Sequence, residues 1–201
     1  MTLQATKPVE PRLRRWTRAE YYDMFDRGMF EGQRVQLIEG EIIEMPAQGN
    51  LHVATISKSD EALRPVLPPN TWIRYQAPLD ATVDSDPEPD LAVVSGSPDE
   101  CTSEHPKTAL LAIEVSDTTL ALDRRKTTIY AAARVQDYWI INLQDGVLEV
   151  HRNPTRAPSA SSGYRYAEVR VLSLGESVAP LMNPQKCIAV SDLFPKTWQS
   201  H

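Results

Sequence analysis

Hydrophobic positions recur along the chain with two different periods, and each period predicts one type of element. Apolar residues at helical spacing predict helices over residues 17–27, 50–66 and 122–134. The first begins with Thr17-Arg18-Ala19-Glu20, the pattern of a capping box, in which residue 20 caps back onto residue 17. The second is stopped by Leu67-Pro68-Pro69, because proline cannot continue a helix.

Extended segments account for most of the other apolar positions. A hairpin is expected over residues 34–45, turning at Glu39-Gly40 and ended by Pro46. The run 109–113 is continuously apolar, which is typical of a strand covered on both faces. Further strands are expected at residues 72–75, 79–83, 91–94, 137–142, 147–150, 164–172 and 188–190. Together the elements predict a mixed α/β (α+β) domain with a largely antiparallel sheet.

Length and composition limit the number of domains and the classes of protein to which the chain can belong. A chain of 201 residues suits one domain, expected over residues 16–201 after a flexible arm at residues 1–15. Residues 154–163 are expected to be a flexible loop. No apolar stretch is long enough for a membrane span, and the start lacks the apolar segment of a secretory signal. Cys101 and Cys187 lie far apart, which favours free thiols in a reducing cytoplasm.

The formal net charge of −6 argues against a protein that coats nucleic acid through bulk positive charge. It does not exclude a nuclease, because a metal site needs carboxylates and one local basic patch can contact DNA. Two short basic clusters are candidates for that contact: Arg12, Arg14 and Arg15, and then Arg124, Arg125 and Lys126. Short basic runs are usually solvated surface, so each is a weak candidate.

Two carboxylates stand at the edges of expected strands. Asp90 follows the acidic, proline-rich turn 84–89 and precedes a strand, and Glu114 follows the apolar run 109–113. If the two strands are neighbours, these carboxylates offer the hard oxygen ligands that Mg²⁺ or Mn²⁺ prefers. Lys126, on the next helix, could then orient a water and neutralise developing charge. The alternative is an ordinary Pro-Asp turn and a solvent-facing glutamate, which is favoured for either residue taken singly.

Other reactive residue types give weaker signals. His52 and His151 are isolated and are expected to be surface or hydrogen-bonded histidines, because no ligand spacing surrounds them. Ser116 has no Ser-His-Asp partners in the sequence, which argues against a serine hydrolase. Tyr138 and Trp139 are expected to pack in the core and not to stack on bases.

Six short blocks, in this order and spacing, resemble the Uma-type family of restriction endonucleases, within the PD-(D/E)XK nuclease superfamily. Any single block is weak, but six in register over about residues 16–155 are specific. The blocks are Leu37-Ile38-Glu39-Gly40-Glu41-Ile42, Pro89-Asp90-Leu91-Ala92, Ile113-Glu114-Val115-Ser116-Asp117, Asp123-Arg124-Arg125-Lys126, Tyr130-Ala131 and Asp137-Tyr138-Trp139-Ile140-Ile141.

The resemblance implies a restriction-endonuclease-like mixed sheet flanked by helices, with an added N-terminal helix and hairpin. It implies that Asp90 and Glu114 are the metal carboxylates. Lys126 would replace the lysine of the motif, because Ser116 occupies the place two residues after the glutamate. If Asp123 opens the following helix, Lys126 lies in its first turn and Tyr130 shares its face.

One position departs from the family pattern. Family members commonly carry a glutamate two residues before the hairpin turn, where this chain has Gln36. An amide oxygen can coordinate a cation or hold a water, but the substitution removes a negative charge.

The resemblance therefore implies a cytoplasmic DNA endonuclease that uses Mg²⁺ (or Mn²⁺) and a metal-activated water. By analogy it is expected to form a homodimer, with no membrane association and no organic cofactor. Two alternatives remain open. One is a catalytically weakened or inactive nuclease fold that binds nucleic acid or a protein partner, and the other is a structural or toxin-system component.

Overall fold

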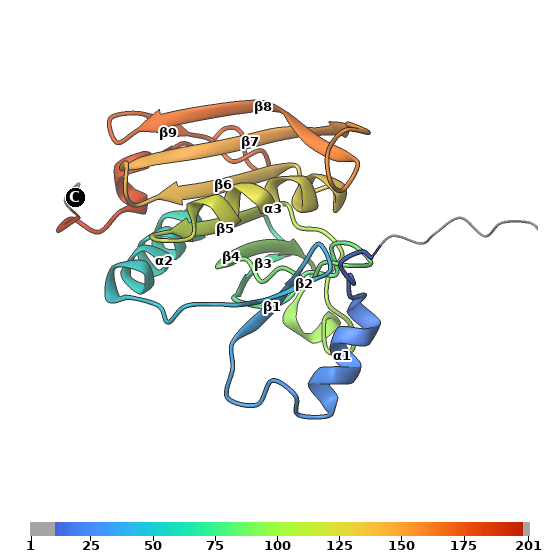
Figure 1. Ribbon diagram of the computed structural model, residues 1–201. Helices are drawn as coiled ribbons and strands as arrows, with labels where there is room; N and C mark the ends of the chain where they lie inside the picture. The colour runs from blue at the N-terminus through green and yellow to red at the C-terminus, as the bar shows by residue number, and fades with distance from the viewer. Residues whose placement is uncertain (1–10, 199–201) are drawn as a thin grey trace, which may run out of the picture.

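A six-stranded mixed sheet forms the centre of the computed structural model, which describes residues 11–198 (Figure 1). All neighbouring strands are antiparallel except the parallel pair β5–β6. Helix α3 (Leu120–Ala132) joins that pair, because parallel neighbours need a crossover connection. In spatial order the strands are β3 (Thr71–Tyr75), β4 (Leu91–Ser95), β5 (Leu111–Ser116), β6 (Asp137–Asn142), β7 (Val147–Arg156) and β8 (Tyr164–Ser173).

Two short hairpin-like sheets lie outside the central one. The predicted hairpin is confirmed as β1 (Val35–Ile38) and β2 (Glu41–Glu44). Its two-residue turn has positive φ at both positions, 49° at Glu39 and 73° at Gly40, which is the geometry of a type I′ turn. The other small sheet pairs β9 (Ser177–Val178) with β10 (Ile188–Ala189).

The helices begin and end close to the residues that the sequence indicates. Helix α1 (Arg18–Asp26) carries the predicted capping box on Thr17 and Glu20. Helix α2 (Asn50–Leu63) continues into the 3₁₀ turn η1 (Arg64–Val66), and two further 3₁₀ turns are η2 (Pro98–Glu100) and η3 (Val190–Leu193). None of the helices within residues 11–198 is long and apolar enough to cross a membrane.

The central strands are buried on both faces, as the apolar run in β5 predicts. One face packs Ile113 and Trp139 with Leu63 of α2. The opposite face packs Ala112 and Tyr138 with residues of α3. Successive residues of a strand point to opposite faces, so α2 and α3 cover different sides of β5 and β6. The core positions predicted for Tyr138 and Trp139 are confirmed, because both side chains are fully buried.

Several predicted boundaries are wrong. Residues 79–83 form no strand: the amides of Leu79 and Asp80 bond to Pro87 and Pro106, which hold this segment off the sheet. Strand β5 is shifted to residues 111–116, so Glu114 lies inside a strand and not at its end. Helix α3 begins three residues before Asp123, and this places Lys126 in the second turn and not the first.

The hairpin formed by β7 and β8 is longer than predicted. Strands β7 and β8 remain paired out to residues 156 and 164, so the connecting loop is shorter than the predicted segment 154–163. The two cysteines are free thiols. The predicted arm lies partly outside the described residues, because residues 1–10 are not described, and the division into residues 1–15 and 16–201 stays a prediction.

Candidate functional site

The register of the central sheet brings the two predicted metal carboxylates together. Leu91 pairs with Ile113 across the antiparallel strands β4 and β5, so the next step of this register sets Asp90 opposite Glu114. Directly opposite residues project from the same face, with Cβ atoms about 5 Å apart. Both side chains are almost completely buried, at 5% and 3% exposed.

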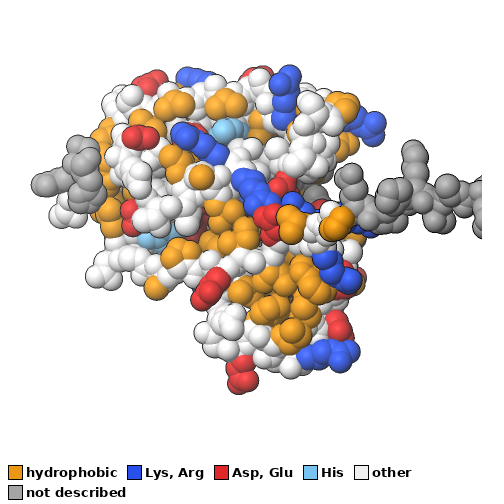
Figure 2. All heavy atoms as spheres, viewed as in Figure 1, with side chains coloured by type: hydrophobic (Ala, Val, Ile, Leu, Met, Phe, Trp, Pro, Cys, Tyr) orange, Lys and Arg blue, Asp and Glu red, His pale blue; other side chains and the backbone are white. Residues whose placement is uncertain are grey.

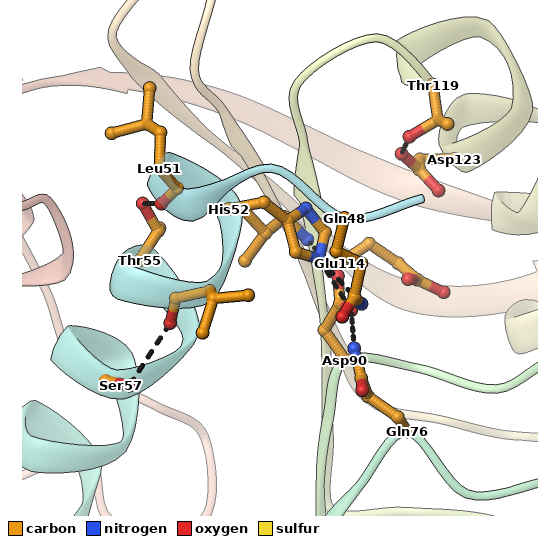
Figure 3. A network of polar contacts seen from close by, with 12 residues as sticks. Gln48, Leu51, His52, Thr55, Ser57, Gln76, Asp90, Glu114, Thr119 and Asp123 are labelled. Atoms are coloured by element: carbon orange, nitrogen blue, oxygen red, sulfur yellow. Dashed lines mark hydrogen bonds and ion pairs between the residues drawn. The ribbon is translucent and has the colours of Figure 1, made fainter. Parts of the chain in front are cut away.

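Asp90 is held by donors from three different segments. Its Oδ2 accepts the backbone N–H of Val115 at 2.8 Å, while its Oδ1 lies 3.1 Å from both His52 Nε2 and Gln76 Nε2 (Figure 3). Burial alone would raise the pKa of Asp90, but the hydrogen bond and charge of His52, with the other two donors, bring it below its ordinary value. Asp90 is therefore an ionised carboxylate in a fixed position, which suits it to bind a cation.

Glu114 has one oxygen engaged by two donors. Its Oε1 accepts from Lys126 Nζ at 3.0 Å and from the Tyr130 hydroxyl at 2.7 Å. Burial nevertheless raises the pKa of Glu114 to about 8, with Asp123 and Asp90 adding to the effect and Lys126 opposing it. Burial thus favours a proton on Glu114, while the ion pair with Lys126 favours its ionised form.

Lys126 is buried among acids in the second turn of α3. Besides Glu114, its Nζ contacts Asp123 Oδ1 at 3.3 Å, and Asp123 also accepts from the Thr119 hydroxyl at 2.7 Å. Burial would lower the pKa of Lys126, but the charges of Glu114 and Asp123 outweigh it and keep the ammonium protonated. The predicted common face of Lys126 and Tyr130 is observed, because both donate to the same oxygen.

These groups line a single cavity. Of the predicted site residues, Asp90, Glu114, Lys126, Asp123 and Gln36 line it, whereas Ser116 and Tyr130 do not. Ser116 is fully buried at the end of β5, and its hydroxyl has no hydrogen-bond partner within residues 11–198. The cavity is also lined by Arg34, His52, Glu88 and Asp117, none of which the sequence had indicated as site residues.

The hairpin carries Gln36 into this cavity. A bridge between Leu37 and Asp86, with the Asp86 amide donating to the Leu37 carbonyl at 2.8 Å, docks β1 against the segment that leads to Asp90. Arg125 of α3 fastens the hairpin turn from the other side through ion pairs with Glu39 and Glu41, at 2.6 and 2.7 Å.

Most residues of the predicted basic clusters form ion pairs with acidic residues of the same chain. Arg124 pairs with Glu149 and Arg125 with the hairpin glutamates, while Arg14 pairs with Glu20 and Arg15 with Glu41. Figure 2 shows Lys and Arg side chains in separate groups among acidic ones on the visible face, and not as one basic surface. Most members of both clusters are thus paired with acids, and a contact of either cluster with DNA stays a prediction.

Two of the cavity residues that the sequence analysis missed, His52 and Glu88, differ in whether the sequence could have indicated them. His52 was expected to be a surface or hydrogen-bonded histidine, and its Nε2 lies within hydrogen-bond distance of Asp90 and of Gln48. Only the fold, which brings the start of α2 next to Asp90 just before β4, reveals this. Glu88 carried a signal that could have been used, since it lies two residues before Asp90 between Pro87 and Pro89, which restrict the segment to extended conformations.

The residues present fit a hard divalent cation. Two buried carboxylates face one cavity, and Gln36 Oε1, a third hard oxygen on its wall, has no hydrogen-bond partner within the described residues. Within residues 11–198 no three His, Cys, Asp or Glu side chains are arranged as a complete metal cage. A site with few protein ligands suits Mg²⁺ best, because Mg²⁺ keeps several of its waters.

Comparisons with known proteins agree with this architecture. A solved structure from Anabaena variabilis, described as "a putative nuclease", matches with a TM-score of 0.65 and 18% identity, covering 89% of this chain and 97% of that chain. At this identity the match shows a shared fold. No curated protein shows significant similarity to the chain. The model of the Uma2 family, "Putative restriction endonuclease", matches residues 18–187, and the chain therefore belongs to this family.

Proposed function

We propose that this protein is a divalent-cation-dependent endonuclease that hydrolyses phosphodiester bonds of DNA. The observation that carries the proposal is the pairing of Asp90 with Glu114 across β4 and β5 in one cavity, with Lys126 bonded to the second carboxylate. Membership of the family supports hydrolysis of nucleic acid. The choice of Mg²⁺ or Mn²⁺, and of DNA, is our proposal.

The charge of the cavity supports a cation requirement. Five carboxylates line the cavity (Glu88, Asp90, Glu114, Asp117 and Asp123), against two permanent cations, Arg34 and Lys126. Without a bound cation, a phosphodiester that entered this cavity would meet an excess of negative charge. A bound divalent cation reverses that balance. The excess of carboxylates in the cavity is thus a reason to expect a bound cation. Once that cation is bound, the carboxylates need not repel the substrate.

The side chains of the cavity would have separate roles in the reaction. Asp90 and Glu114 would hold the cation, which when bound supplies charge stabilisation and a water of lowered pKa. Lys126 stays protonated and is placed to stabilise negative charge that develops on the phosphate. Arg34 lies on the cavity wall and makes no ion pair within residues 11–198, so its guanidinium is available to a phosphate oxygen.

Cleavage of a supercoiled plasmid, with short single- and double-stranded oligonucleotides in parallel, tests the proposal. Cutting is expected with Mg²⁺ or Mn²⁺ and none with EDTA. Asp90→Ala should lose both cleavage and cation binding. Lys126→Met should lose cleavage but keep most cation binding, because a protonated lysine is not a ligand. If Lys126→Met cuts as fast as wild type, the role given to Lys126 is wrong.

Glu44→Gln is a suitable control for these variants. Glu44 is an exposed carboxylate at the end of β2 and does not line the cavity. Its substitution should leave cleavage unchanged, so a loss of activity there would point to general damage by carboxylate removal.

A second candidate function is a binding module that keeps the nuclease fold without cutting. Gln36, at a position where the family resemblance implies a glutamate, and the net charge of −6 favour it. Binding of the same oligonucleotides without product, in either metal and over a range of pH, would favour this candidate over hydrolysis.

Two further expectations accompany the proposal. A homodimer would let two sites address two strands, and sedimentation velocity should then give about twice the chain mass at micromolar concentration. A single species of monomer mass would contradict the dimer. A cytoplasmic location is expected, and fractionation of the source cells would test it.

A further inference from the structure

Strand β8 has an open outer edge within the described residues. It is the last strand of the six-stranded sheet, and Figure 1 shows it at the outer edge of that sheet. Its backbone pairs with β7 on the inner side, and within residues 11–198 no backbone–backbone hydrogen bond of residues 166–172 lies outside that ladder. Alternate residues of an edge strand direct their N–H and C=O groups away from the sheet, so β8 can pair with one more strand.

The side chains of β8 are also open, on both faces of the sheet. Residues 167–171 are all exposed, although successive residues of a strand point to opposite faces. Val169 and Val171 are 56% and 60% exposed, whereas their partners on β7, residues 151 and 149, are buried. Along this edge of the molecule, Figure 2 shows hydrophobic side chains together with charged ones of both signs. Exposed valines on an unpaired strand favour association with another strand.

The sequence of β8 is complementary to itself in the antiparallel direction. In a two-fold pairing centred on Val169, Glu168 of each copy stands opposite Arg170 of the other copy. Opposite charges at such positions stabilise a strand pair, and neither side chain forms an ion pair within residues 11–198. On the other face, Val169 stands opposite itself and Val171 stands opposite Ala167.

The neighbouring two-fold registers lack this complementarity. A pairing centred on Glu168 sets two glutamates opposite each other, and one centred on Arg170 sets two arginines opposite each other. Like charges in directly opposite positions destabilise a strand pair. The register centred on Val169 also lies near the middle of β8, so residues 165–173 of both copies can pair. Charge and strand length therefore favour the same register.

We propose that β8 is a self-association surface, through which a second copy of this chain joins its central sheet to the first, edge to edge. The contact uses the same residues on both copies, so it closes as a dimer and leaves neither β8 edge open. It gives an interface to the homodimer expected above. No residue of β8 lines the cavity, and β6 and β7 separate β8 from β5, so the interface is independent of the cation site.

Sedimentation velocity of the full chain over a range of micromolar concentrations tests the interface. The wild-type protein should sediment as a dimer that dissociates on dilution. Val169→Lys places two ammonium groups at the two-fold axis and should raise the dissociation constant of the dimer about tenfold or more. Val83→Lys is the matched control, because Val83 is a 72% exposed valine outside β8, and it should dimerise as wild type does. Both variants should melt and bind Mn²⁺ as the wild-type protein does.

Charge reversal tests the register without depending on the fold of a single variant. Glu168→Arg alone sets arginines opposite Arg170 of the other copy, and Arg170→Glu alone sets glutamates opposite Glu168, so each variant should be monomeric. An equimolar mixture of the two variants restores both unlike pairs, and it should form a mixed dimer. The dimer of the mixture should have a dissociation constant close to that of the wild type.

The outcomes separate this interface from the proposed nuclease function. Undiminished dimerisation of Val169→Lys, or a mixture that stays monomeric, would overturn pairing through β8. A wild-type protein that sediments as a monomer at all concentrations would overturn it as well, and so would a series of species larger than a dimer. Mn²⁺ binding by a monomeric wild-type protein would leave the proposed cation site standing.

Discussion

At the scale of single residues, the site depends on how burial sets the charge of Glu114. Its carboxyl is enclosed by Lys126, Tyr130 and the sheet, and burial raises its pKa to about 8 although the charge of Lys126 opposes the rise. Asp90, with more donors and a lowered pKa, stays ionised. The pKa values of the two carboxylates are therefore shifted in opposite directions: burial dominates at Glu114, whereas hydrogen-bond donors outweigh it at Asp90.

This difference predicts how cation binding depends on pH. Below about pH 8 a cation must displace the proton of Glu114, so Mn²⁺ affinity should increase about tenfold per pH unit from 6 to 8 and level off above. Calorimetry across this range measures it. His52→Gln removes the other titratable side chain that contacts Asp90 and should keep the slope. An affinity independent of pH between 6 and 8 would contradict this protonation of Glu114 in the cation-free site.

Arg34 gives a second prediction at this scale. As an unpaired cation on the cavity wall it should contact one phosphate, so Arg34→Ala should weaken DNA binding and reduce the salt slope of log K by about 0.9. Fluorescence anisotropy with Asp90→Ala protein, at several salt concentrations, measures this without cleavage. Arg27→Ala is the matched control, because Arg27 is paired with Asp23 on the surface of α1. Equal slopes for all three proteins would remove Arg34 from the phosphate site.

Among the elements, the β1–β2 hairpin connects the fold to the chemistry. It is no part of the central sheet, and it is held by the Leu37–Asp86 bridge and by Arg125 of α3. The same hairpin carries Gln36 to the cavity. Arg125, which looked like a candidate for DNA contact in the sequence, acts instead as the link between α3 and the hairpin.

Arg125→Met should therefore weaken cation binding from a distance. Losing two partly exposed ion pairs should cost about 1 kcal/mol of stability or less, but the loosened hairpin should hold Gln36 less firmly and lower Mn²⁺ affinity severalfold. Calorimetry and thermal denaturation measure the two effects. Arg27→Met, which removes an ion pair far from the hairpin, should change neither. An unaltered Mn²⁺ affinity in Arg125→Met would mean that the hairpin is held in place without this link.

Local signals predicted most of these elements, because each depends on neighbouring residues. The capping box at Thr17, the Glu39-Gly40 turn and the apolar run of β5 all express short-range chemistry. The failures depend on distant contacts. Residues 79–83 have strand composition, yet their backbone groups bond to Pro87 and Pro106. Glu114 was placed at a strand end because its polarity was taken as a boundary, whereas Lys126 and Tyr130 satisfy it inside the sheet.

For the whole molecule, the sheet topology places the site. Asp90 precedes β4, Glu114 lies in β5, Lys126 comes from the crossover helix, and His52 from the start of α2 on the other side of the sheet. The sequence and the family resemblance indicated the first three. They could not indicate His52 or Arg34, because these reach the cavity only through the packing of α2 and the docking of the hairpin.

The central claim is that Asp90 and Glu114 share one divalent cation, and calorimetric titration of Mn²⁺ tests it most directly. The wild-type protein at pH 8 should bind Mn²⁺, while Asp90→Ala and Glu114→Ala should each lose that binding and still melt cooperatively. Glu44→Gln should bind as wild type does. Absence of Mn²⁺ binding in the wild type, or undiminished binding in Asp90→Ala, would contradict the account.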